Sequence, residues 1–86
     1  MSYKIVFTKQ AAKDYQTILT SPYKGKLLRL LLVLEQAPMQ PPFEKLVDKS
    51  DTFSRRINLQ HRLVYQILEE ERTVKIIRMW TYYGDN

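Results

Sequence analysis

The sequence contains no cysteine, which excludes disulfide bonds and a metal site built from thiolates. It also lacks any apolar run close to the roughly 20 residues that a membrane-spanning helix needs. The first residues lead directly into an alternating stretch, without a charged leader followed by an apolar segment and a cleavage site. These absences predict a cytoplasmic protein that needs no metal or cofactor and has no membrane partner.

The chain is short, and its length limits the fold. With 86 residues, it can bury only roughly 60% of the surface of the unfolded chain, enough for one core. No internal repeat, low-complexity tract or flexible linker interrupts it, and the proline-rich stretch 38–42 is typical of a rigid connection. We therefore expect a single domain spanning residues 1–86.

The charge balance points to the class of partner. Fourteen basic residues against nine acidic ones give a formal net charge of +5. On so small a surface this favours polyanions, such as nucleic acid or an acidic protein segment. The acidic group 69–71 is separate in sequence from the arginine-rich stretch that contains Arg55, Arg56 and Arg62. Charge alone, however, specifies no chemistry.

Hydrophobic periodicity predicts an α+β fold that begins with a strand and two helices. Residues 3–7 are typical of a strand, and Thr8 can cap a helix over 8–20. A second helix is predicted over 22–37, before Pro38. Its broad apolar stripe consists of Leu27, Leu28, Leu31, Leu32 and Leu34.

The second half of the chain supplies the sheet that these helices need. Strand-like runs cover residues 53–58, 61–68 and 73–80. Two helices cannot bury such stripes on each other alone. The predicted order is therefore strand, two helices and three antiparallel strands, with a helical hairpin packed on a twisted antiparallel sheet.

The hairpin over residues 53–65 holds the first functional signal. Side chains alternate between the two faces of a strand, so the length of the loop decides which of them meet. With 58–60 as the loop, one face is apolar, with Phe53, Ile57, Leu63, Tyr65 and Ile67, and the other is polar, with Ser54, Arg56, Arg62 and Gln66. Two guanidiniums on one face can clamp a phosphate with paired hydrogen bonds. The alternative is that they form ordinary exposed cross-strand ion pairs.

This hairpin is also recognisable. Ser-Arg-Arg-Ile at 54–57 and His-Arg-Leu-Val-Tyr at 61–65 resemble, in letters and spacing, the hairpin of the YoeB/Txe toxins of the RelE/ParE superfamily. The resemblance extends over nearly the whole chain, through the leading strand, the helices, the proline-containing connection, Phe-Glu-Lys-Leu at 43–46 and the final aromatic-rich strand. It implies the compact RelE-like microbial ribonuclease fold.

The resemblance also implies a function. Such a protein is the toxin of a type II toxin–antitoxin system, and it cleaves messenger RNA in the ribosomal A site without a metal and so inhibits translation. Its partners would be the ribosome with its mRNA and a YefM/Axe-like antitoxin whose disordered acidic segment folds onto the basic surface. A homodimer within the toxin–antitoxin complex would also fit.

Three catalytic roles follow from the resemblance. Glu44 is similar in position to the glutamate that acts as general base on the ribose 2′-hydroxyl. Arg62 resembles the arginine that binds the scissile phosphate, and Arg56 resembles a second, supporting arginine. These roles need no metal, because a carboxylate can take the proton of the 2′-hydroxyl while arginines neutralise the charge that develops on the phosphate.

The chain departs from the family at its C-terminal end. The family ends in His-Tyr, whereas here Tyr82 stands at the histidine position and Tyr83 follows. A phenol, with a pKa of about 10, can donate a proton to the leaving 5′ oxygen, although less readily than imidazole. Neighbouring residues of a strand project to opposite faces, so only one tyrosine can join Arg62, and the choice stays open. We expect weaker cleavage and a structural role for His61.

Further cations would extend the RNA-binding surface. Lys45, Lys49 and Arg55 are expected to contact the backbone of the mRNA or of ribosomal RNA. Two other functions fit the sequence. One is a toxin of the same fold without nuclease activity, which binds a protein target or only its antitoxin. The other is a plain RNA-binding module, although no RNP, KH or helix-turn-helix signature is present.

Overall fold

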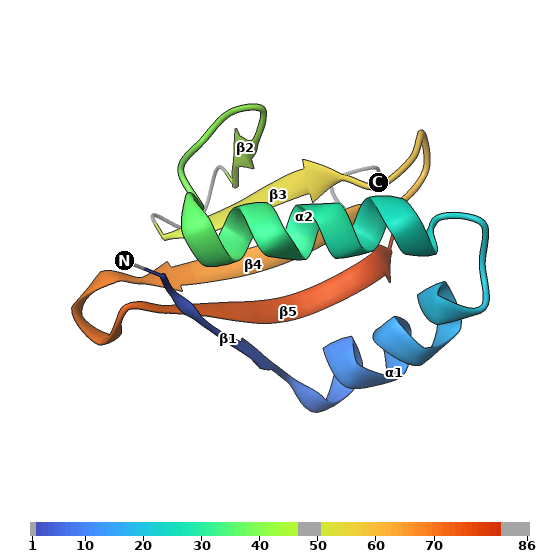
Figure 1. Ribbon diagram of the computed structural model, residues 1–86, viewed down its shortest axis with the longest axis horizontal. Coiled ribbons are helices and arrows are strands. Elements are labelled where there is room, and N and C mark those ends of the chain that lie inside the picture. Colours follow the sequence, from blue (N-terminus) through green and yellow to red (C-terminus); the bar gives the residue numbers. More distant parts are fainter. Residues whose placement is uncertain (1, 47–50, 82–86) are drawn as a thin grey trace.

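The computed structural model describes residues 2–46 and 51–81. Within them, two helices pack against one five-stranded sheet (Figure 1). The elements in chain order are β1 (Lys4–Phe7), α1 (Lys9–Leu19), α2 (Lys24–Gln36), β2 (Glu44–Lys45), β3 (Thr52–Arg56), β4 (Arg62–Leu68), a 3-10 turn (Glu69–Glu71) and β5 (Thr73–Thr81). The predicted α+β class and element order are confirmed, with β2 as an additional short strand.

The strands lie in the order β1-β5-β4-β3-β2. From β2 to β5 every neighbouring pair is antiparallel, as expected for β3, β4 and β5. The pairing of β1 differs, because this strand runs parallel to β5 with Lys4 opposite Thr73 and Phe7 opposite Ile76. A parallel neighbour needs a long crossover rather than a tight turn, and the segment from α1 through the later strands provides it.

Helix α1 begins where the sequence predicts. The Thr8 hydroxyl oxygen accepts a hydrogen bond from the Ala11 amide at 3.0 Å, which satisfies one of the free donors of the first turn. The same hydroxyl donates to the Ile77 carbonyl at 2.8 Å. Thr8 therefore starts the helix and ties it to β5, against which α1 lies (Figure 1).

Helix α2 crosses one face of the sheet, but its buried stripe is narrower than the sequence suggests (Figure 1). Leu27 and Leu34 are fully buried, and Leu31 packs against the core. Leu28 and Leu32 are 42% and 54% exposed, so the prediction that they belong to the buried stripe was wrong. The helix starts at Lys24 rather than at residue 22, and Leu30 completes its inner side by packing against the core next to Leu31.

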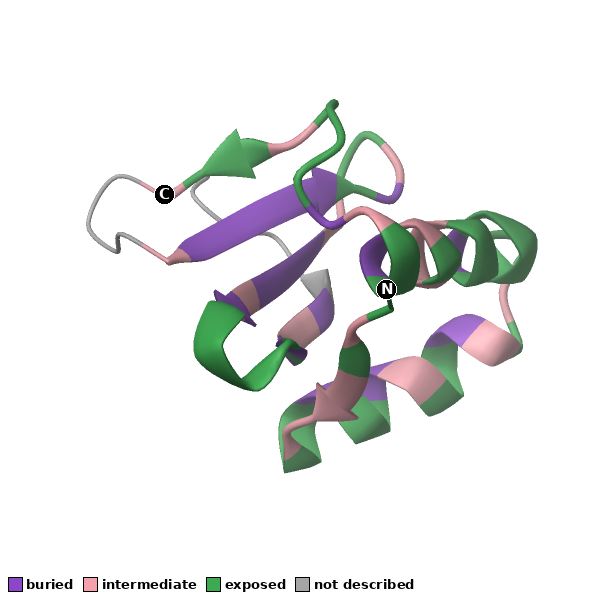
Figure 2. Cartoon of the chain, turned by 60° about the vertical axis from the view of Figure 1, so that its left-hand side comes forward, coloured by how far each residue is buried: buried purple, intermediate pink, exposed green. Residues whose placement is uncertain are grey.

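The core lies between the helices and the three long strands, which carry most of the buried residues (Figure 2). The predicted apolar face of the hairpin is confirmed, since all five of its members are buried: Phe53, Ile57, Leu63, Tyr65 and Ile67. An irregularity in β5 determines which of its side chains face the core. Tyr65 lies opposite Ile76 and Val64 opposite Arg78, so one extra residue shifts the alternation and Met79 points into the core.

No helix within the described residues is both long and apolar enough to cross a membrane.

Candidate active site

Glu44 and Arg62 meet on the polar face of the sheet. Glu44 lies in the two-residue edge strand β2, opposite Ser54 of β3, and Arg62 opens β4. The Arg62 Nη1 donates to the Glu44 Oε1 at 2.6 Å and to the Ser54 hydroxyl at 3.3 Å. The sequence analysis predicts no strand at Glu44, whereas the structure places it in the short strand β2. Pairing with β3 therefore aims its carboxylate at Arg62.

This ion pair is open to solvent. The side chain of Glu44 is 63% exposed and that of Arg62 is 21% exposed. An exposed pair of this kind contributes only about 0–1 kcal/mol to stability. The fold therefore depends little on it, and both side chains remain accessible to a ligand that approaches this face.

Arg56 and Arg62 lie on directly opposite positions of β3 and β4, as the parity of the hairpin predicts. The Arg56 side chain is exposed, and its Nη1 donates to the Leu59 carbonyl at 3.4 Å. Like charges at opposed positions repel each other, and one carboxylate, Glu44, offsets part of this positive charge. The arrangement leaves the face suited to an anion.

Ser54 is a site residue that the sequence analysis did not assign. It is 1% exposed, lies between Glu44 on β2 and Val64 on β4, and accepts the second hydrogen bond from Arg62. The signal was present, because the alternation of β3 places Ser54 on the face of Arg56. Its buried hydroxyl thus gives the Arg62 guanidinium a second acceptor beside the Glu44 carboxylate.

The remaining predicted cations are distributed differently. Lys45 is exposed and lies opposite Phe53, so strand alternation turns it away from the face of Glu44. Lys49, Tyr82 and Tyr83 lie outside the described residues.

The prediction that Arg55 contacts RNA was wrong, because this side chain is only 3% exposed. Alternation along β3 places Arg55 on the apolar face with Phe53 and Ile57. Its guanidinium donates to the Tyr65 hydroxyl and to three carbonyls of the proline-rich connection. Its hydrogen-bonding groups are thus used inside the protein.

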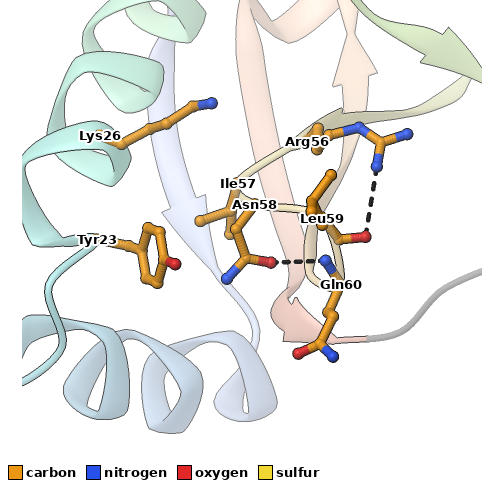
Figure 3. A pocket seen from close by; sticks show the side chains of 7 residues that line it. All are labelled: Tyr23, Lys26, Arg56, Ile57, Asn58, Leu59 and Gln60. Carbon is orange, nitrogen blue, oxygen red and sulfur yellow. Dashed lines mark hydrogen bonds between the residues drawn. The ribbon is translucent and has the colours of Figure 1, made fainter.

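A shallow pocket borders the site. It has a volume of about 530 Å³ and lies between the start of α2, with Tyr23 and Lys26, and residues 56–60, which form the end of β3 and the connection to β4 (Figure 3). The Asn58 Oδ1 closes this connection by accepting from the amides of Gln60 and His61. The pocket and the polar face share Arg56, so one ligand could contact both.

The backbone of His61 takes part in the turn before β4. Its carbonyl accepts from the amides of Ile57 and Asn58 at 2.9 and 3.3 Å, which closes the turn before β4. Within residues 2–46 and 51–81, no three His, Cys, Asp or Glu side chains are grouped so that they could hold a metal ion.

Solved structures with the same architecture are known. A YoeB–YefM complex from Staphylococcus aureus matches with 30% sequence identity and a TM-score of 0.74, over 94% of this chain and 98% of the matched chain. The chain belongs to the YoeB/RelE family of toxins.

Other YoeB/RelE-family structures agree. The YoeB dimer from Staphylococcus aureus matches with 29% identity and a TM-score of 0.80, covering 94% of this chain and 98% of the other. A YoeB/ParE toxin from Agrobacterium tumefaciens, with 24% identity, shares the fold at a TM-score of 0.81 over 93% and 99% of the two chains. No protein-family model and no curated protein matches the sequence significantly.

Proposed function

We propose that this YoeB/RelE-family toxin is a metal-independent endoribonuclease that cleaves mRNA in the ribosomal A site and so inhibits translation in the cytoplasm. One observation carries the proposal. A solvent-accessible carboxylate, Glu44, and a guanidinium, Arg62, lie 2.6 Å apart on a face that also bears Arg56. When a ribose 2′-hydroxyl attacks the adjacent phosphate, the reaction requires a base and a phosphate-binding group that lie close together.

In the proposed reaction the scissile phosphate first binds to Arg62. It replaces part of the hydrogen bonding that Arg62 makes to Glu44 in the free protein. Glu44 then removes the proton of the 2′-hydroxyl, and this oxygen forms a bond to phosphorus. Arg62 and Arg56 neutralise the charge that develops on the phosphoryl oxygens.

The bond from phosphorus to the 5′ oxygen breaks in the same step. The leaving oxygen takes a proton from a phenol, and Tyr82 and Tyr83 remain the two candidates for this acid. The products are a 2′,3′-cyclic phosphate and a free 5′-hydroxyl.

The ribosome would supply what this small protein lacks. The basic face has few groups that read bases, so positioning of the mRNA would come from the A site, where fixed geometry lowers the barrier. Lys45 and Lys49 are proposed to contact the RNA backbone away from the reacting phosphate. Each such contact adds affinity that weakens with salt.

The test adds purified protein to programmed ribosomes and maps mRNA breaks by primer extension. Wild-type protein should cut in the A-site codon, and Glu44→Gln should not. Glu35→Gln, which alters an exposed glutamate of α2, is the matched control and should cut normally. The upstream fragment should accept a 3′ tail only after its terminal phosphate is removed. Intact mRNA with active ribosomes would contradict the proposal and favour a toxin that acts by binding a protein.

An antitoxin is the second proposed partner. The Staphylococcus aureus relative was solved in a complex with YefM, and this chain combines a net charge of +5 with exposed Leu28 and Leu32 on α2. A disordered acidic segment with apolar positions would suit both features as it folds. Co-expression with the antitoxin should abolish cleavage, and size-exclusion chromatography of the complex would show whether two toxin chains assemble in it.

A further inference from the structure

The buried guanidinium of Arg55 lies directly behind the segment that leads to Glu44. Its Nη2 donates to the carbonyls of Pro38 and Gln40 at 2.9 and 2.7 Å, and its Nη1 donates to that of Pro42 at 3.1 Å. Its Nε donates to the Tyr65 hydroxyl at 3.0 Å. A guanidinium has five N–H groups, so nearly all of its hydrogen-bonding capacity is used.

The ring contacts of Arg55 reach still closer to Glu44. Its guanidinium carbon lies 5.7 Å from the ring centre of Phe43 and 5.8 Å from that of Tyr65. Phe43 in turn meets Phe53 edge to face at 5.5 Å. Arg55 therefore contacts both residues that immediately precede Glu44, through the carbonyl of one and the ring of the other.

The strand that carries Glu44 cannot hold this position by itself. β2 has two residues, both exposed, at the edge of the sheet, and isolated short edge pairs are weak. The connection before it contains three prolines, at 38, 41 and 42, which have no N–H with which to build a hydrogen-bonded turn. Arg55 satisfies three carbonyls of this connection and fixes where it enters β2.

Stability alone does not explain a charge at this place. No carboxylate of the described residues forms an ion pair with Arg55, and a buried charge usually costs more than an apolar side chain of similar size. We propose that Arg55 is a positioning residue, whose role is to hold Glu44 at the reacting face against Arg62. This inference rests on the proposed nuclease function and names the residue that places its base.

Two substitutions test the proposal. Arg55→Met keeps the length and loses every hydrogen bond, and Arg55→Lys keeps the charge without the fork. Both should remain folded by circular dichroism. The single-turnover cleavage rate should fall about 100-fold in Arg55→Met, the size of effect that a displacement near 1 Å can cause. Arg29→Met, which removes an exposed guanidinium of α2, is the matched control.

A double-mutant cycle separates positioning from a general loss of structure. If Arg55 acts through Glu44, then Arg55→Met should change the residual rate of Glu44→Ala by less than about twofold, because the two residues act as one unit. Additive losses would overturn the proposal, as would a wild-type rate in Arg55→Met.

Amide hydrogen exchange supplies a readout that does not need activity. The Leu46 amide donates to the Thr52 carbonyl at 3.0 Å, and Arg55→Met should speed its exchange, and that of residues 43–45, about tenfold or more relative to amides of β4 and β5. If the wild type does not cleave RNA but this loosening is seen, the proposed function fails and the positioning role stands. Unchanged exchange at residues 43–46 would overturn the positioning role itself.

Discussion

Arg56 and Arg62 occupy directly opposite positions on β3 and β4. Two like charges at such positions destabilise a sheet, and here one acidic partner, Glu44, bonds to Arg62 while Arg56 bonds to a backbone carbonyl. The free protein therefore retains a repulsion that a bound phosphate would relieve. Stability and anion binding oppose each other at this pair.

Replacing Arg56 with glutamine should stabilise the protein and impair it at the same time. Loss of the repulsion should raise the melting temperature by about 1–5 °C, from roughly 0.2–1 kcal/mol for an opposed like-charge pair in a chain of this size. The gain should shrink at high salt, and RNA cleavage should weaken. Thermal unfolding at low and high salt checks this, with Arg29→Gln as control. A lower melting temperature would show that Arg56 is held by attractive contacts instead.

Replacing Arg62 with lysine should slow cleavage although the charge is kept. Lysine lacks the planar fork that bonds two phosphoryl oxygens together. Loss of such a bond to a charged group costs roughly 1.5–3 kcal/mol, or about 10- to 100-fold in rate. Single-turnover cleavage on ribosomes measures this, with Arg29→Lys as the comparison. An unaltered rate would mean that a point charge is sufficient at this position.

The Tyr65 phenol should make the protein sensitive to alkali. Burial raises its pKa above the ordinary 10.0, and the neighbouring Arg55 offsets this only in part. Near pH 10 the unfolded chain releases this proton while the folded chain still holds it. The contribution of the protonated phenol to stability is therefore complete below pH 10 and is lost as the pH rises through the folded pKa. Urea unfolding at pH 8 and at pH 10.5 should show a smaller fall for Tyr65→Phe than for wild type.

Other groups titrate in the same range and need a control. Tyr3 also has a raised pKa, because its hydroxyl donates to the Glu69 carboxylate. Tyr3→Phe therefore shows how much an exposed phenol contributes. Equal slopes for Tyr65→Phe and wild type would contradict the assignment of the alkaline sensitivity to Tyr65.

Asp14 should stabilise the C-terminal end of β5 by accepting hydrogen bonds from it. Its Oδ2 accepts from the Arg78 Nε at 2.9 Å and from the Met79 amide at 3.0 Å, and its side chain is 11% exposed. Asp14→Ala leaves a buried amide without its acceptor, which costs about 1–3 kcal/mol. Asp14→Asn keeps one acceptor and should lose less.

Chemical denaturation of the two Asp14 variants, with Glu35→Gln as the control, measures this loss. Because β5 leads to the tyrosines proposed as the acid, Asp14→Ala should also slow cleavage. Wild-type stability in Asp14→Ala would remove both expectations.

Local backbone geometry was enough to predict the elements and one face of the site. Thr8 can accept from a free amide wherever it precedes a helix, and a hairpin with an odd loop must place Leu63 and Tyr65 on one face and Arg56 and Arg62 on the other. These are local consequences of backbone geometry, so they could be read without a partner. The same parity placed Arg55 inside, but the usual exposure of charge led to the opposite expectation.

The relations between distant segments could not be predicted in this way, because they depend on the packed fold. Three such relations depend on how the segments pack. Glu44 pairs with β3 and contacts Arg62, β1 lies parallel to β5, and Arg55 donates to three carbonyls of the proline-rich connection. The phase of α2, which exposes Leu28, depends on it too. Such contacts join residues far apart in the chain, and their energies exist only once the core has brought the segments together.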